Sequence, residues 1–369
     1  MRLSHIPLIV LAAGAALAVA GPAPAELAVV SKVPAQQPFG DRLEVHSDAL
    51  GRDMIVTVTP PLTGLPKGEK VPAIYALDEG YGVAGPAGSA MAGGGAMAPA
   101  LVVAVGWVPG QWDKRDEDLL YGAAAYDGRS LHGRGPAFEA FLLQELKPFI
   151  ERTYPADPAR AVLFGHSSGG NFAAEILGRK PDAFSAYVIG SPAFWVDTEA
   201  LPAVTQAVRS GAAKQVFVAA GGAETPVMLR DEAALVAALT APGSRMSVRS
   251  HVYAGARHGG YFTPLFAESF PWLLPPPAEQ AEVPVQVLAG YAGAFRLPDG
   301  RVLRITARGG QLFADMAGFA ERELLAVDRQ TFRLPDAPIR YRFTEGGKGV
   351  VMHANGADTP GQRIGTPGA

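Results

Sequence analysis

The most informative stretch of the chain is "AVLFGHSSGGNFAAEIL", residues 161–177. An apolar run with strand character leads into a glycine-flanked pair of serines, and an alanine-rich helix follows at once. A strand, a sharp turn and a helix within so few residues leave Ser167 exposed at the turn. The pattern Gly-x-Ser-x-Gly at such a turn is typical of a strained loop that presents a nucleophile. A simple Ser-Gly helix cap is the alternative interpretation.

The bulk composition limits the classes of function. The chain has 369 residues, of which 48% are hydrophobic, so it can bury a large core. Its formal net charge of −3 provides no basic field for nucleic acid. Because cysteine is absent, disulfides, thiolate zinc sites and a cysteine nucleophile are all excluded.

The first 25 residues have the pattern of a secretory signal peptide. Arg2 precedes an apolar run, and small residues follow it. Cleavage is expected after Ala25 or Ala20, with an uncleaved anchor as the alternative. We therefore expect an exported protein, periplasmic or secreted, that has no membrane association after cleavage.

Hydrophobic periodicity divides the rest of the chain into two parts. Over residues 26–275, short apolar strands alternate with amphipathic helices, which predicts an α/β fold with a mostly parallel sheet and helices on both faces. Within it, the Gly- and Ala-rich segment 84–100 is expected to be a mobile loop. A proline-rich linker is predicted over residues 276–287. Short strands with Pro-Asp-Gly and Gly-Gly turns predict a small, barrel-like all-β domain over residues 288–369.

A serine hydroxyl becomes a good nucleophile only when a base takes its proton and a carboxylate holds that base. After a strand-turn-helix nucleophile, the acid and then the histidine follow in chain order. His258, in a Gly-rich loop after a late strand, is the predicted base, whereas His251 lies within the strand itself. Glu224, just past the preceding strand, is the predicted acid. Asp231 and Asp197 are the alternatives.

Backbone N–H groups are needed to stabilise an oxyanion in such a site. The N–H of Ser168 opens the helix and is one expected donor. The second is expected from the loop "ALDEGYG" after an early strand, from Tyr81 or Gly80. No group of His, Asp and Glu has metal-ligand spacing along the chain, so no metal or other cofactor is expected.

Residues from about 40 to 275 resemble the Putative esterase family of α/β-hydrolases, which includes siderophore esterases, S-formylglutathione hydrolases, feruloyl esterases and mycolyltransferases. The matching pieces are "IYALDEG", "RDEDLLYG" and the run from Phe138 to Trp195. The resemblance implies a serine hydrolase of the α/β-hydrolase fold. In the siderophore-esterase branch, the positions matching the catalytic residues are Ser167, Glu224 and His258. The C-terminal piece "YAGAFRLPDGRVLRITARGGQLFADM" is similar to the β module appended to some serine β-lactamase-like hydrolases.

A small-molecule ester is the expected partner, and a catecholate siderophore is one candidate. Such a bulky trianion favours cationic and aromatic contacts, for which Arg115, Trp112, Arg134 and Trp195 are the candidates. The leading hypothesis is an exported serine esterase that forms an acyl-enzyme. The alternatives are an acyltransferase of the same fold, a feruloyl- or acetyl-type esterase, and a catalytically silent binding protein. The sequence carries no signal of the oligomeric state.

Overall fold

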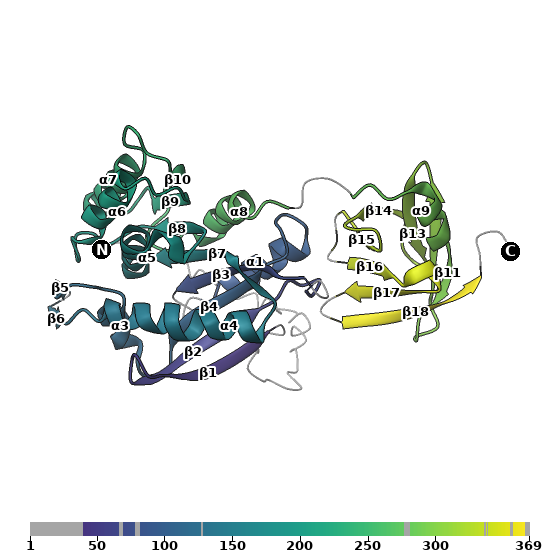
Figure 1. The fold of residues 1–369 in the computed structure, drawn as a ribbon, viewed down its shortest axis with the longest axis horizontal. Coiled ribbons are helices and arrows are strands. Elements are labelled where there is room, and N and C mark those ends of the chain that lie inside the picture. Colours follow the sequence, from purple (N-terminus) through teal and green to yellow (C-terminus); the bar gives the residue numbers. More distant parts are fainter. Residues whose placement is uncertain are drawn as a thin grey trace, which may run out of the picture. The chain divides into compact units, whose positions relative to one another are not determined.

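The computed structural model describes residues 40–65, 69–77, 82–126, 128–276, 281–335, 337, 339–354 and 357–365. The predicted signal peptide lies outside these residues. Within them the chain forms a large sheet flanked by helices and, separately, a closed β-barrel (Figure 1). None of the helices in the described ranges is long and apolar enough to cross a membrane.

An eight-stranded mixed sheet is the scaffold of the larger part. Its strands lie in the order β1-β2-β4-β3-β7-β8-β9-β10. The pairs β1·β2 and β2·β4 are antiparallel, and all the other neighbours are parallel. The strands are Asp41–Ser47 (β1), Arg52–Thr59 (β2), Val71–Leu77 (β3), Leu101–Trp107 (β4), Ala156–His166 (β7), Ala186–Gly190 (β8), Gln215–Gly221 (β9) and Ser247–Tyr253 (β10). The predicted mostly parallel sheet is confirmed.

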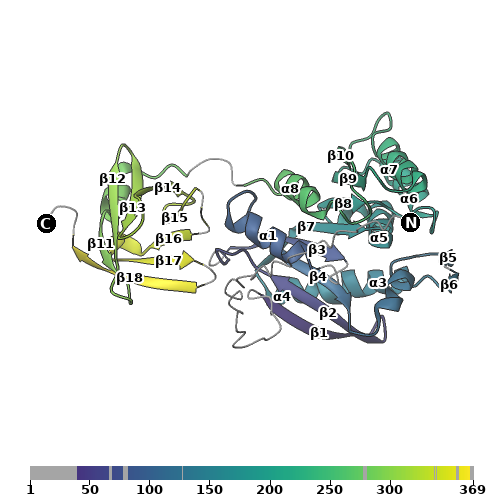
Figure 2. The ribbon, with the colours of Figure 1, turned by 180° about the vertical axis from the view of Figure 1, so that it is seen from behind.

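Helices cover both faces of this sheet (Figures 1 and 2). One face is covered by α3 and α4, which are joined by a π-helical segment, together with α5, α6 and α7, and the other by α1 and α8. The helices are Ala84–Gly93 (α1), Gly135–Ala140 (α3), Phe141–Leu146 (π), Lys147–Thr153 (α4), Ser168–Arg179 (α5), Ala200–Arg209 (α6), Pro226–Leu239 (α7) and Phe262–Leu273 (α8). Between β4 and α3 lie the short helix Arg115–Asp118 (α2) and the small hairpin Ala124–Tyr126 (β5) and Arg129–Leu131 (β6).

The strands are apolar on both sides because both of their faces are buried. In β3, Tyr75 and Leu77 pack into the core under α3 to α7, whereas Ile74 and Ala76 pack into the core under α1 and α8. All seven residues of β3 are buried. Near-continuous apolar runs are what a helix-covered parallel sheet requires.

The prediction of a mobile loop over residues 84–100 is wrong in its first half. Residues Ala84–Gly93 form helix α1, which lies against β4. A Cβ placed on Gly88 would lie 2.5 Å from a methyl of Val102. The small residues of this segment therefore allow a helix to pack closely on the sheet, a role that composition alone does not distinguish from flexibility.

The C-terminal part is a closed antiparallel barrel in which β11 pairs with both β12 and β18. The strands are Gly293–Arg296 (β11), Val302–Arg308 (β12), Gln311–Met316 (β13), Arg322–Ala326 (β14), Thr331–Arg333 (β15), Ile339–Phe343 (β16), Gly349–Ala354 (β17) and Ala357–Gly365 (β18). Closure leaves no unpaired edge strand, so the barrel needs no partner sheet. The predicted barrel-like fold is confirmed.

A short helix, α9 (Val285–Tyr291), packs onto the barrel core. The ring of Tyr291 stacks on Phe343 with the centroids 4.4 Å apart, and Leu288 is also buried there. The helix begins inside the segment predicted as a linker, residues 276–287. The exact domain boundaries stay predictions.

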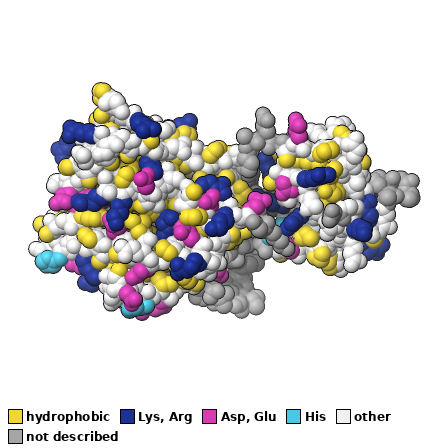
Figure 3. All heavy atoms as spheres, in the orientation of Figure 1, with side chains coloured by type: hydrophobic (Ala, Val, Ile, Leu, Met, Phe, Trp, Pro, Cys, Tyr) yellow, Lys and Arg dark blue, Asp and Glu magenta, His cyan; other side chains and the backbone are white. Residues whose placement is uncertain are grey.

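Charged side chains of both signs are interspersed on the face drawn in Figure 3, with hydrophobic side chains scattered among them. No single-sign patch dominates this face.

Candidate active site

Ser167 occupies a strained turn between β7 and α5. Its φ of 60° and ψ of −122° are unfavourable for a residue with a Cβ. The turn is held because the Ser167 N–H donates to the Gly190 carbonyl at 2.9 Å and the Ser167 carbonyl accepts from Asn171 N–H at 2.9 Å. Strain of this kind at a strand-to-helix turn is typical of an exposed nucleophile.

The glycine before the turn is required by close backbone approach. A Cβ on Gly165 would lie 2.0 Å from the carbonyl oxygen of Gly169, far inside van der Waals contact. The first glycine of the Gly-x-Ser-x-Gly pattern thus has a steric cause in this chain.

Glu224 and His258 are in contact beyond the carboxyl ends of β9 and β10. His258 Nδ1 lies 3.2 Å from Glu224 Oε1. The Glu224 side chain is fully buried, whereas His258 is partly exposed. A buried carboxylate on Nδ1 leaves Nε2 of His258 as the nitrogen able to accept a proton from a nucleophile.

His166, which the sequence analysis did not single out, lies beside this pair. Its ring centroid is 4.4 Å from that of His258, and it directly precedes Ser167 in the chain. Burial lowers the pKa of His166 well below its ordinary value, and the positive charges of His258 and Arg115 act in the same direction. His166 is therefore neutral, and its ring packs against His258 beside the serine turn without adding a charge to the site.

The loops that carry the acid and the base are tied together through their backbones. Gly222 N–H donates to the Tyr253 carbonyl and Ala223 N–H donates to the Ala256 carbonyl, both at 2.8 Å. Gly221 has no room for a side chain, because an added Cβ would lie 2.5 Å from the Ala256 oxygen. These contacts fix Glu224 relative to the loop that carries His258.

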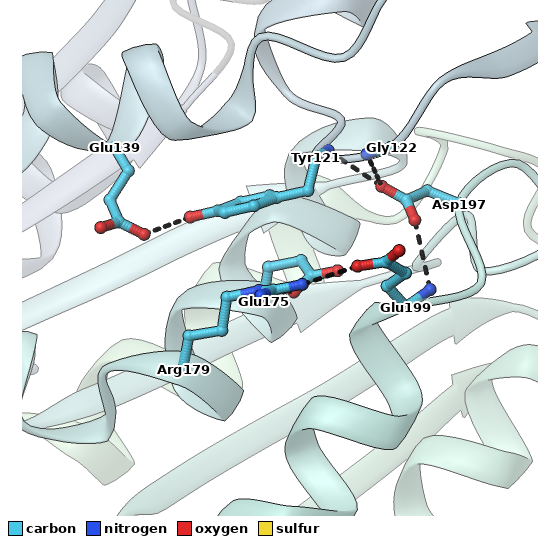
Figure 4. A network of polar contacts seen from close by, with 7 residues as sticks. All are labelled: Tyr121, Gly122, Glu139, Glu175, Arg179, Asp197 and Glu199. Atoms are coloured by element: carbon cyan, nitrogen blue, oxygen red, sulfur yellow. Dashed lines mark hydrogen bonds and ion pairs between the residues drawn. The ribbon is translucent and has the colours of Figure 1, made fainter.

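The alternative acids and the alternative base have other partners. Asp197 accepts the backbone N–H groups of Tyr121 and Gly122 at 2.9 and 3.1 Å (Figure 4). Asp231 accepts from the N–H of Trp195 at 2.9 Å. Nδ1 of His251, on β10, lies 2.9 Å from Oε2 of Glu268, on α8. The geometry therefore favours Glu224 and His258.

The Asp197 loop belongs to a larger polar network near the end of α5 (Figure 4). Arg179 donates to buried Glu175 at 2.6 Å and to Glu199 at 2.9 Å, and its guanidinium lies over the ring of Tyr121. Burial raises the pKa of Glu175, although Arg179 opposes the shift. This network fixes the segment that links α2 to α3.

One of the expected oxyanion donors can be placed. Ser168 is the first residue of α5, where backbone N–H groups have no partner within the helix. Its hydroxyl donates to Asp116 Oδ1 at 3.2 Å. The other candidates, Tyr81 and Gly80, lie outside the described residues.

The four residues predicted to bind substrate have different surroundings. Arg115 is buried and donates to the His166 carbonyl at 3.1 Å, so it stabilises the backbone next to Ser167. Arg134 donates to the Leu50 carbonyl at 2.9 Å. Trp112 and Trp195 are 48% and 37% exposed, and the ring of Trp112 contacts Trp107 and the guanidinium of Arg115. Roles in substrate binding stay predictions for all four.

Side chains able to ligate a metal converge at one place in the described residues. His166, Glu224 and His258 each offer a ligand atom within 4.8 Å of the others. These side chains come from the end of β7 and from two separate loops, so spacing along the sequence could not have revealed the group. Two of them already form the acid–base contact, and the expectation that no cofactor is needed stays a prediction.

Residues 47–273 match the family described as Putative esterase. The chain belongs to this esterase family. The match covers more than half of the chain and contains Ser167, Glu224 and His258. The resemblance predicted from the sequence motifs is thereby confirmed.

Relatives within the esterase family were found by sequence and by structure. The ferri-bacillibactin esterase BesA of Bacillus subtilis is 48% identical over 68 residues, 18% of this chain and 24% of that protein. The siderophore enterobactin esterase of Emericella nidulans is 36% identical over 84 residues, 22% of this chain and 28% of that protein. The aligned stretches thus span about a quarter of these curated relatives.

Solved structures match over far more of their length. The BES protein from Bacillus cereus superposes with a TM-score of 0.60 at 22% identity, covering 67% of this chain and 99% of that chain. The siderophore hydrolase EstB from Aspergillus nidulans gives 0.54 at 21% identity, covering 66% and 98%. These similarities confirm the α/β-hydrolase fold of the larger part.

Proposed function

We propose that the protein is a serine carboxylic-ester hydrolase with Ser167 as nucleophile, His258 as general base and Glu224 as the acid that orients it. The observation that carries the proposal is the contact between His258 Nδ1 and the buried Glu224, beside the strained turn of Ser167. The strained backbone of Ser167, the buried carboxylate of Glu224 and its contact with His258 all lie at the carboxyl ends of neighbouring parallel strands. Sites of open α/β sheets lie at this edge.

The reaction would proceed through an acyl-enzyme. Ser167 Oγ attacks the ester carbonyl while His258 Nε2 takes its proton, and the carbonyl oxygen becomes an oxyanion stabilised by the N–H of Ser168. The protonated His258 then donates to the departing alcohol. Water, deprotonated by His258, releases the carboxylic acid and restores Ser167.

For the substrate class we propose siderophore esters. The two curated relatives carry the names of a ferri-bacillibactin esterase and an enterobactin esterase. Trp112 and Trp195, which are partly exposed, would supply aromatic contacts to such a substrate. We further propose export through the signal peptide, which N-terminal sequencing of the protein recovered from its native host would test.

The function is tested by hydrolysis of p-nitrophenyl acetate and butyrate. Ser167→Ala and His258→Gln should each lower kcat/KM by at least about 1,000-fold with the fold retained. His251→Gln is the matched control and should keep wild-type activity, because His251 pairs with Glu268 instead. Activity that survives Ser167→Ala would exclude this serine as the nucleophile. A panel of ferric catecholate trilactones and feruloyl esters would then test the substrate class.

A further inference from the structure

A line of hydrogen bonds continues from Glu224 into the core. Ser191 Oγ donates to Glu224 Oε1 at 2.7 Å, and this is the same oxygen that faces His258 Nδ1. The hydroxyl of Tyr261 is in hydrogen-bond contact with Ser191 Oγ. Both Ser191 and Tyr261 are almost fully buried. The acid is therefore held by a second group that no motif in the sequence indicates.

The direction of the protons along this line follows from the chemistry of the groups. An ionised carboxylate only accepts hydrogen bonds, so Ser191 must give its single hydroxyl proton to Glu224. Tyr261 must then donate to Ser191. Burial raises the pKa of Tyr261, with the charge of Glu224 acting in the same direction, which keeps the phenol protonated as a donor.

The two hydroxyl residues are themselves held in fixed positions. Ser191 has a φ of 41°, unfavourable for a residue with a Cβ, and its N–H donates to the Ala219 carbonyl at 2.7 Å. The ring of Tyr261 stacks on Tyr253 at 5.3 Å between centroids. Strain at Ser191 persists because the surrounding contacts over-determine its backbone.

The orientation of the Glu224 carboxylate depends on its contact with Ser191, because the second carboxylate oxygen does not help to hold it. Glu224 Oε2 is buried and has no hydrogen-bond partner within the described part of the chain. Both polar contacts of the carboxylate that are seen there fall on Oε1. Without the Ser191 donor, the bond to His258 would be the one hydrogen bond left to the carboxylate among the described residues.

We propose that Ser191 and Tyr261 are positioning residues, which fix the Glu224 carboxylate so that Oε1 faces His258 Nδ1. The inference rests on the proposed function, because it assigns a role around the acid of that site. Neither residue touches the reacting atoms. Their effect is to keep His258 in the tautomer and orientation that accept the Ser167 proton.

Three variants test the proposal by ester hydrolysis. Ser191→Ala and Ser191→Gly should each lower kcat by about 10-fold with KM unchanged, because a hydrogen bond to a charged group is lost. Tyr261→Phe should lower kcat by about 3-fold, since it weakens the Ser191 donor without removing it. Glycine also relieves the backbone strain, so equal losses in the two Ser191 variants would assign the effect to the hydroxyl.

Tyr187→Phe is the matched control. Tyr187 is a fully buried tyrosine on β8 whose hydroxyl donates to the Pro181 carbonyl at 3.0 Å, away from the acid. Removing its hydroxyl should reduce the thermal midpoint of unfolding about as much as Tyr261→Phe does, and leave kcat unchanged. An equal loss of kcat in Tyr187→Phe would mean that the effect is merely structural and would overturn the proposal.

A readout that needs no turnover separates this inference from the proposed function. In protein labelled with 15N-histidine, the Nδ1 proton of His258 reports directly on its hydrogen bond to Glu224. Its resonance should shift in Ser191→Ala and stay in place in Tyr187→Phe. An unchanged resonance in folded Ser191→Ala overturns the proposal, whether or not the wild-type protein hydrolyses the test esters.

Discussion

Gly221 is the last residue of β9, and it packs against the backbone of the loop that leads to His258. Replacing Gly221 with alanine should lower activity although this residue takes no part in the reaction. The new Cβ would lie 2.5 Å from the Ala256 oxygen, 3.0 Å from the Ala256 carbonyl carbon and 3.1 Å from the Arg257 oxygen. All three atoms belong to the backbone of the loop that leads to His258. No flexible side chain is present to absorb the overlap, so the two loops must move apart.

The size of the effect follows from that overlap. Relief to ordinary van der Waals contact requires a displacement of about 1 Å. The same movement would break the bond from Ala223 N–H to the Ala256 carbonyl and lengthen the 3.2 Å contact between Glu224 and His258 beyond hydrogen-bond range. A misplacement of this order costs about 100-fold in rate, and the overpacking costs about 1–3 kcal/mol of stability.

The assay is kcat/KM for p-nitrophenyl butyrate, with the urea midpoint measured on the same samples. Gly290→Ala is the matched control, because a Cβ at Gly290 in α9 meets nothing within 4 Å. It should keep full activity and gain up to about 1 kcal/mol of stability. If Gly221→Ala folds and retains kcat/KM within about twofold of the wild type, the steric reasoning and the required closeness of the two loops are both wrong.

Three further predictions concern the surroundings of the site. Glu224→Gln should lower kcat by about 1,000-fold or more. Asp197→Asn keeps one oxygen that can accept from the N–H groups of Tyr121 and Gly122, but it loses the negative charge and the second oxygen, which accepts from the Glu199 N–H, so it should cost about 1–2 kcal/mol in urea denaturation and keep kcat. The reverse pattern would make Asp197 the acid. Arg115→Met should reduce the free energy of unfolding by about 3 kcal/mol, because the buried guanidinium donates to the His166 carbonyl and to Asp116. If the variant instead keeps its stability and only its KM rises, Arg115 has a substrate-binding role. Burial raises the pKa of Glu175, so folding favours its protonated form and its contribution to stability falls as the pH rises above about 4.5. In Glu175→Gln, the midpoint of urea unfolding should therefore depend less on pH in that range. An unchanged pH dependence would contradict this sign.

Local patterns predicted much of the larger part correctly. The apolar run and serine turn at residues 161–177 become β7, the strained Ser167 and α5, because each depends on near neighbours in the chain. The chain order of serine, acid and histidine made Glu224 and His258 the leading acid and base, with Asp197 and Asp231 left open as acids, and the structure brings Glu224 and His258 into contact. The segment 84–100 was mispredicted because small residues suit both a mobile loop and a closely packed helix.

Local patterns along the chain are enough to predict the strand and helix periods and the glycine-flanked serine turn, and they make Glu224 and His258 the leading acid and base. The tertiary structure adds that His166 lies against the ring of His258, that Ser191 and Tyr261 continue the hydrogen bonds of Glu224, and that buried Arg115 donates to the backbone next to Ser167. This difference follows from the range of the interactions. Backbone propensity and amphipathic period act over a few residues and are readable along the chain. Contacts across β7, β8, β9 and β10 depend on the register of neighbouring parallel strands, which places residues far apart in sequence within hydrogen-bond distance.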